Sequence, residues 1–447
     1  MRKLITAAVL SVLIPCAVGA QTPPDWSSIQ AEAVRTIQSY IRINTSNPPG
    51  DVTKAADFLI DILEREGVPV KRYESAPGRS IFVARLKGRG PAKPILLLHH
   101  MDVVPTDPAQ WQHDPFAADI ADGNIWGRGA MDMKGFGVVQ LMAFLSLKRR
   151  NVPLDRDVLF MAVPDEEVGG ALGAEWMLKN HFADIDPEYI LDEGGLGSRD
   201  LFATGKLVFG ISVAEKKLIW LKVRAKGVAG HGSQPNDQNP NDRLTRALAR
   251  LLSEPLPTSP FSVLETMKSR IGPLAPSKFT NAIQHSTIAI TTLRSGVGDP
   301  PKVNVIPSVA EATLDCRVLP GTTKDQWMAE IRRRLGDASL EIEIMDEGPD
   351  PTITTQDSAF YRALESAVKR KHPDAIVTPM LVPYATDSNE YRPRGVKAYG
   401  FTPVIVPAAA VASMHGDAEF LPVESIGPAI QILFEALSET VGGEASK

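Results

Sequence analysis

Imidazole and carboxylate side chains that could bind metal ions occur in four short motifs and at one isolated position of this sequence. In chain order they are His100-Met101-Asp102, Asp132 in GRGAMDMKG, Glu166-Glu167 in VPDEE, Asp192 in ILDEGG, and the lone His415 in SMHGD. Nitrogen and oxygen ligands without thiolates are typical of a hydrolytic zinc centre, not of a structural cysteine site. Five such ligands and a spare carboxylate fit two metal ions with a shared ligand better than one closed site.

His100 and Asp102 lie two residues apart, so on an extended segment their side chains share a face. The Asp102 carboxylate could then accept the proton of the second ring nitrogen and fix the tautomer of His100 for metal binding. His99 points the opposite way and is expected to pack. Taken alone, each motif also has an ordinary interpretation: a loop histidine, a helix N-cap at Asp132, or a solvated acidic loop.

Glu166 and Glu167 are adjacent, so their side chains diverge. Two consecutive carboxylates at the end of a strand are costly to bury unless a cation is present. One carboxylate can bind metal while the other stays free to accept a proton from water. The pair therefore predicts a metal ligand next to a general base.

These motifs follow strand-like segments. Apolar runs over 80–86, 94–99 and 158–163 predict buried strands, and residues 135–150 predict a long apolar helix. Short apolar strands that alternate with helices indicate an α/β fold with a mostly parallel sheet flanked by helices. The candidate ligands come just after such strands, where sites form in open α/β sheets.

The pattern changes after about residue 212. Alternating strands at 217–226, 286–292, 310–318 and 340–344, with helices at 242–252 and 324–335, predict a small α+β domain. We predict a signal peptide at 1–20, a catalytic domain at 21–212 and 348–447, and an inserted domain at 213–347. His415 then belongs to the second part of a discontinuous catalytic domain.

Composition places limits on partners. The chain has 447 residues, 43% of them hydrophobic and 23% charged, as in soluble globular proteins. A net charge of −5 favours neither nucleic-acid nor membrane binding.

The first residues predict export to the periplasm or the medium. Arg2 and Lys3 precede an apolar run over 4–14, and Val18-Gly19-Ala20 offers a cleavage site. The run is shorter than the roughly 20 residues needed to span a membrane. Lipoprotein anchoring at Cys16 is the alternative. Cleavage would leave Cys316 as the single cysteine, which excludes an intramolecular disulfide framework.

Several longer motifs resemble one family across essentially the whole mature chain. They are LLLHHMDVVP, WQHDPF followed by DGNIWGRGAMDMKG, VPDEEVGG, KGVAGHGSQP, NVIP and DCRVLPGT. In this order they resemble the superfamily of co-catalytic zinc hydrolases that includes aminoacylase, carboxypeptidases G and S, acetylornithine deacetylase and succinyl-diaminopimelate desuccinylase. The resemblance implies a zinc-peptidase catalytic domain and an inserted lid that serves in dimerisation.

The resemblance also implies roles for the motif residues. Asp132 would bridge two Zn²⁺ ions, with His100 and Asp192 on one ion, Glu167 and His415 on the other, Glu166 as general base and Asp102 orienting His100. Co²⁺ or Mn²⁺ could occupy the same ligands. The peptide bond after Asp132 is typically cis in this family. We choose Asp192 over Glu193 because the LDEG pattern resembles that of aminoacylases.

The lid motifs imply substrate contacts. His231 would donate a hydrogen bond to the tetrahedral oxyanion, in family members often from the partner subunit of a homodimer. Asn304 and Arg317 match positions that hold a substrate carboxylate, for which the planar guanidinium fork is suited. Arg392, after ATDSNEY, would add a second carboxylate contact.

The resemblance leaves three functions open. The first is hydrolysis of an amide bond adjacent to an amino acid with a free carboxylate, as in metallocarboxypeptidases and dipeptidases. The alternative is an N-acyl-amino-acid amidohydrolase of aminoacylase type, so the substrate would be a small peptide or an N-acyl amino acid. The third is a catalytically silent peptide-binding protein of the same fold.

Overall fold

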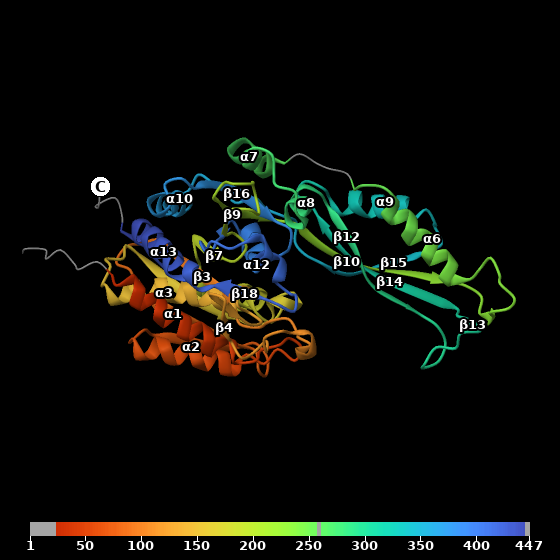
Figure 1. Ribbon diagram of the computed structural model, residues 1–447, viewed down its shortest axis with the longest axis horizontal. Helices are drawn as coiled ribbons and strands as arrows, with labels where there is room; N and C mark the ends of the chain where they lie inside the picture. Colours follow the sequence, from red (N-terminus) through yellow and green to blue (C-terminus); the bar gives the residue numbers. More distant parts are fainter. Residues whose placement is uncertain (1–23, 257–260, 443–447) are drawn as a thin grey trace, which may run out of the picture.

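The computed structural model describes residues 24–256 and 261–442, so the predicted signal peptide lies outside the described residues. The chain forms a large α/β body and a narrower extension (Figure 1). No helix within the described ranges is long and apolar enough to cross a membrane.

The body is built on a nine-stranded sheet with the order β1-β2-β6-β3-β7-β17-β9-β16, and β8 pairs with β9. Its strands are β1 (Val70–Glu74), β2 (Ser80–Leu86), β3 (Ala92–His100), β6 (Arg156–Val163), β7 (Tyr189–Asp192), β8 (Gly197–Ser198), β9 (Val208–Glu215), β16 (Ile376–Val382) and β17 (Lys397–Gly400). The central strands β6, β3, β7 and β17 run parallel, as do β9 and β16. The mostly parallel sheet predicted from the sequence is confirmed.

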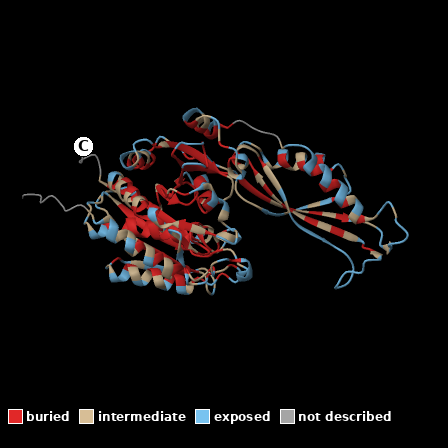
Figure 2. Cartoon of the chain, in the orientation of Figure 1, coloured by how far each residue is buried: buried red, intermediate tan, exposed pale blue. Residues whose placement is uncertain are grey.

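Helices cover both faces of this sheet because successive side chains of a strand point to opposite sides. In β3, Ile95 and Leu97 join one apolar core, whereas Leu96 and Leu98 join the other. The larger core is covered by α1 (Trp26–Ile41), α2 (Thr53–Arg65), α3 (Lys134–Arg149), α10 (Ala359–Lys371) and α13 (Ile426–Val441). The smaller core lies under α4 (Ala174–Asn180), α5 (Phe182–Ile185) and α11 (Ser388–Tyr391). Figure 2 shows the resulting buried layer.

The extension, called the lid below, is an antiparallel sheet with the order β12-β14-β10-β15. Its strands are β12 (Thr287–Ser295), β14 (Val309–Val318), β10 (Lys217–Lys226) and β15 (Glu341–Glu347). One face packs on α6 (Pro240–Ser253) and α9 (Lys324–Leu335) through residues such as Leu221, Leu248 and Trp327. At the far end, β11 (Gly230–His231) pairs with β13 (Val305–Ile306) (Figure 1).

Two helices within the predicted insertion return to the body. In α7 (Ser262–Ile271) and α8 (Lys278–Gln284), the apolar residues Met267, Ile271 and Ile283 are buried in the larger core of the body and not in the lid. The predicted bounds 213–347 do not anticipate this excursion. Lys278 and Phe279 at the start of α8 line the cavity described below.

A three-stranded sheet joins distant parts of the body. Strand β18 (Phe420–Pro422) pairs with β5 (Asn124–Trp126), which pairs with β4 (Ile120–Ala121). This pairing brings the C-terminal segment that carries His415 to the loop that carries Asp132. The remaining elements are α12 (Ala408–Ser413) and the 3₁₀ turns η1 (Pro108–Gln110), η2 (Glu166–Val168), η3 (Arg392–Arg394) and η4 (Val423–Ser425).

Candidate metal centre

His100 is the last residue of β3 and is 1% exposed. Its Nδ1 lies 2.9 Å from the backbone oxygen of Asp102 and 3.7 Å from Oδ1 of the same residue. Its Nε2 faces three carboxylates, with Asp132 Oδ1 at 3.1 Å, Glu193 Oε1 at 3.6 Å and Glu166 Oε2 at 4.0 Å. A proton on Nδ1 directed at Asp102 would leave Nε2 free to bind a cation.

Asp132 lies between two histidines. Oδ1 approaches His100, and Oδ2 lies 3.0 Å from Nε2 of His415, which is also 3.2 Å from Glu167 Oε2. The two oxygens of one carboxylate thus face two separate imidazoles, as expected of a bridging ligand. The Asp132–Met133 peptide bond is cis, which confirms the prediction for this bond.

The buried carboxylate of Glu419 holds the loop that carries Asp132. Its Oε1 accepts hydrogen bonds from the backbone N–H groups of Met131 and Asp132, at 2.8 and 3.0 Å. Its Oε2 accepts from the N–H of Gly129 and from the guanidinium of Arg128, at 3.2 and 2.7 Å. The sequence interpretation missed Glu419, for which the only signal was its position shortly after His415.

Asp102 has a second task besides facing His100. Its carboxylate accepts the backbone N–H groups of Glu166 and Glu167, both at 3.3 Å, and the side-chain amide of Asn47 at 2.9 Å. These bonds fix the 3₁₀ turn on which the two glutamates lie. As predicted, their side chains diverge, because Glu166 approaches His100 whereas Glu167 approaches His415.

The structure corrects the prediction for Asp192. One carboxylate oxygen of Asp192 accepts hydrogen bonds from the N–H and the hydroxyl of Ser388, at 2.9 and 2.8 Å. Glu193, the next residue, faces His100 instead. Adjacent residues at the end of a strand point to opposite sides, so only one of them can reach the cluster.

Burial and mutual repulsion shape the protonation of the cluster. Burial, together with the charge of Asp132, raises the pKa of Glu193 to about 8. Burial also raises the pKa of Glu166 well above its usual value. Hydrogen bonds to Asp132 and Glu167 raise the pKa of His415 to about 10. Without a cation, burial therefore favours the protonated forms of Glu166 and Glu193, because four ionised carboxylates against two imidazoles would leave an excess of negative charge in the cluster.

The donor set fits two divalent cations. One group of ligand atoms comes from His100, Glu166 and Glu193 and a second from His100, Asp132 and Glu167, with all atoms of a group within 4.8 Å of one another. Imidazole nitrogen and carboxylate oxygen are the donors preferred by zinc, cobalt and manganese. A cation would also offset the negative charge and favour the ionised carboxylates.

The cluster opens into a cavity of about 1160 Å³ between the body and the lid. Asp132, Glu166 and Glu167 line one side, and Trp220 and Arg317 of the lid also line it. The Arg317 guanidinium forms an ion pair with Asp315 at 2.7 Å. The structure therefore places Arg317 in the same cavity as the cluster.

His231 and Asn304 lie elsewhere, at the far end of the lid. The exposed ring of His231 accepts hydrogen bonds from the N–H and the hydroxyl of Ser233, and the N–H of Gly232 donates to the carbonyl of Asn304 at 2.7 Å. Neither residue belongs to the cavity wall formed by the described residues. One chain does not bring them to its own cluster.

The predicted substrate contact of Arg392 is wrong. This side chain is 3% exposed and forms a buried ion pair with Glu215. Its Nε also donates to the Thr354 hydroxyl and to the Ala398 carbonyl, each at 3.2 Å. Arg392 is not among the described residues that line the cavity.

Comparison with known proteins identifies the family. The model of peptidase family M20/M25/M40 matches residues 96–439. This chain belongs to that family. Among its relatives, this M20 member is 28% identical to aminoacylase-1 of Mus musculus over 379 residues, which cover 83% of this chain and 87% of the relative.

Solved structures share the fold of this M20 member. An M20 family metallo-carboxypeptidase from Sulfolobus solfataricus superposes with a TM-score of 0.70 at 18% identity, covering 92% of this chain and 99% of the other. Human carnosine dipeptidase 1 gives 0.71 at 17% identity, covering 94% and 99%. This chain is therefore a metal-dependent hydrolase of the peptidase and aminoacylase family.

Proposed function

We propose that this M20 enzyme hydrolyses the amide bond next to an amino acid that carries a free carboxylate, as a metallocarboxypeptidase or dipeptidase does. One observation carries the proposal: the cluster around Asp132 and a lid guanidinium, Arg317, line a single cavity. The cluster supplies a base for the reacting bond, and the guanidinium supplies a partner for the carboxylate.

Five residues would hold two metal ions, which we propose to be zinc: His100, Asp132, Glu167, Glu193 and His415. When bound, such ions polarise the amide carbonyl and acidify the attacking water. Glu166 accepts the proton of that water while oxygen bonds to the carbonyl carbon. It then delivers the proton to the leaving nitrogen as the carbon–nitrogen bond breaks. Asp102 holds both His100 and the turn of Glu166 in place.

We further propose that a homodimer completes the site, with His231 and Asn304 entering the cluster of the partner subunit. Two observations support this. Both residues are exposed at the end of the lid, and neighbouring Val303 is 102% exposed. Strand β12 is also an exposed outer strand of the lid sheet, where a second copy could pair.

A second candidate is hydrolysis of N-acyl amino acids, in which the carboxylate side of the substrate is the same. Apolar side chains of Leu201, Phe279, Val411 and Met414 line the cavity, which suits a hydrocarbon acyl group better than a charged peptide N-terminus. The relationship to aminoacylase-1 is consistent with this candidate.

The deciding experiment uses the zinc-loaded protein with a panel of dipeptides and N-acyl amino acids. In Glu166→Gln the metal content should be unchanged, while kcat falls by about 100- to 10,000-fold because no group accepts the proton of water. Glu390→Gln is the matched control, since Glu390 lines the same cavity without approaching His100 or His415. Full activity of Glu166→Gln would exclude the proposed role, and a wild type that binds but cleaves no substrate would indicate a silent binding protein.

We also propose that the enzyme is exported, on the basis of the residues before Gln21. Mass spectrometry of the mature protein should show a chain that begins at Gln21. A mature chain that retains Met1 would contradict export by cleavage, and a lipid-modified Cys16 would indicate the lipoprotein alternative.

A further inference from the structure

Lys216 lies at the junction between the body and the lid. It is the single residue between β9, in the body sheet, and β10, in the lid sheet. Its side chain is 0% exposed, and within the described part of the chain Nζ has no hydrogen-bond partner. Burial of an ammonium group without an anionic partner is unfavourable, so the unpaired Lys216 lowers the stability of the folded chain.

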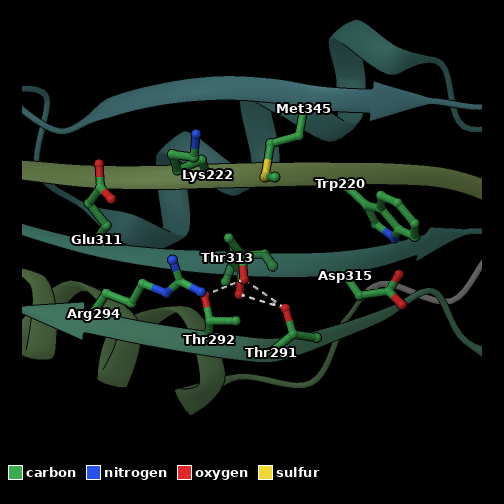
Figure 3. Close-up of a pocket in the computed structure, with 10 residues that line it drawn as sticks. Trp220, Lys222, Thr291, Thr292, Arg294, Glu311, Thr313, Asp315 and Met345 are labelled. Carbon is green, nitrogen blue, oxygen red and sulfur yellow. Dashed lines mark hydrogen bonds between the residues drawn. The ribbon is translucent and has the colours of Figure 1, made fainter. Parts of the chain in front are cut away.

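Strand register places Lys216 beside Arg317. Leu218 pairs with Arg317 and Trp220 with Asp315, so these four side chains share one face of the lid sheet. Figure 3 shows Trp220 and Asp315 on this face. Alternate residues of a strand face the same side, so Lys216, two positions before Leu218, lies on this face as well. Three residues of the face, Leu218, Trp220 and Arg317, line the catalytic cavity.

The acidic groups of the neighbouring chain segments each pair with another basic side chain. Glu215 pairs with Arg392, and Glu347 and Asp350 both pair with Lys217. Asp315 pairs with Arg317.

Asp315 is thus shared between Arg317 and Lys216. Burial and the charge of Arg317 lower the pKa of Lys216 to about 7, and only Asp315 acts against them. With Lys216 protonated, one positive charge stays unmatched at the root of the lid.

We propose that Lys216 is a specificity-determining residue that, together with Arg317, holds the free carboxylate of the substrate at the root of the lid. A single carboxylate is the anion that completes the charge balance. Lys216 is fully buried and does not itself line the cavity, so its flexible four-carbon stem would turn the ammonium toward the wall formed by Leu218 and Arg317. This inference rests on the proposed function and adds a second cation to its carboxylate site.

The test compares substrates that differ only in this charge: N-acetyl-leucine against N-acetyl-leucinamide, and Ala-Leu against its C-terminal amide. For Lys216→Met, KM for the carboxylate compounds should rise about 10- to 100-fold, with kcat and the carboxamide values unchanged. Lys216→Arg should restore most of the affinity. Lys222→Met is the matched control, because Lys222 lies on the same strand and face but is paired in register with Thr313, away from Arg317, and has its own carboxylate partner in Glu343.

Thermal unfolding separates this role from a structural one. Removal of an unpaired buried charge should leave the melting temperature of Lys216→Met unchanged or raise it. A lowered melting temperature with unchanged discrimination between carboxylate and carboxamide would overturn the proposal. Calorimetric binding of N-acetyl-leucine and N-acetyl-leucinamide to zinc-loaded Glu166→Gln, with and without Lys216→Met, tests it without turnover. If Glu166→Gln binds N-acetyl-leucine more tightly than N-acetyl-leucinamide but the wild type cleaves neither dipeptides nor N-acyl amino acids, only the proposed function is refuted.

Discussion

The metal-binding cluster and the far end of the lid differ in how completely one chain builds them. Each ligand of the cluster lies within reach of another, and buried groups such as Glu419 and Asp102 fix the loops that carry them. At the far end of the lid, the side chain of His231 is exposed, and its hydrogen bonds within the described residues go to the neighbouring Ser233. A single chain therefore assembles the candidate metal cluster, whereas His231 and Asn304 stay apart from it, as the proposed homodimer requires.

The largest effect should come from the cluster itself. Glu193→Ala should lose metal and lower kcat by on the order of 1000-fold, because loss of one ion removes several kcal/mol of transition-state stabilisation. Asp192→Asn should keep its metal, since the amide oxygen can still accept from Ser388. Metal analysis and kcat of both variants decide between the two adjacent acids. Metal loss in Asp192→Asn with full occupancy in Glu193→Ala would reverse the assignment.

The next effect concerns the far end of the lid. His231→Ala should lower kcat by about 100- to 1000-fold, as removal of one oxyanion donor does, with unchanged metal content. Mixed dimers of His231→Ala and Glu166→Gln should regain activity, because one of their two sites would combine an intact cluster with an intact lid. If the mixture stays as inactive as its parents, His231 does not act from the partner subunit.

The smallest effect on catalysis should come from Arg392. Arg392→Met leaves Glu215 buried without its partner and should lower the free energy of unfolding by about 3–5 kcal/mol. Below the melting temperature, KM for carboxylate substrates should change little, in contrast to Arg317→Met. Denaturant unfolding and KM measured on both variants provide the check. A large rise in KM for Arg392→Met without a loss of stability would instead support the original prediction that Arg392 contacts the substrate.

Regular elements of both regions were predictable because their apolar periodicity is local. Strands β2 and β10 and helix α9 begin and end at the predicted residues. The excursion of α7 and α8 was missed because their apolar faces show that they are buried but not against which domain. That partner is set by packing between residues distant in sequence, such as α7 against β16.

The site was predictable where motif and strand end coincide, as at His100 and Glu167. The choice between Asp192 and Glu193 failed because alternation says that two neighbours face opposite sides but not which side holds the cluster. Glu419 and Arg392 show the same limit, since a single buried charge is interpretable only with its partner in view. The separation of His231 from the cluster is likewise a property of the folded chain.

The central claim is tested most directly by stepwise return of Zn²⁺ to chelator-treated protein. At each step, the rate of hydrolysis is measured with a dipeptide or N-acyl amino acid that the wild type cleaves. Activity should rise until two ions are bound per chain, because the two carboxylate oxygens of Asp132 face two separate imidazoles, His100 and His415. Full activity of the metal-free protein, or a maximum at one ion per chain, would contradict it.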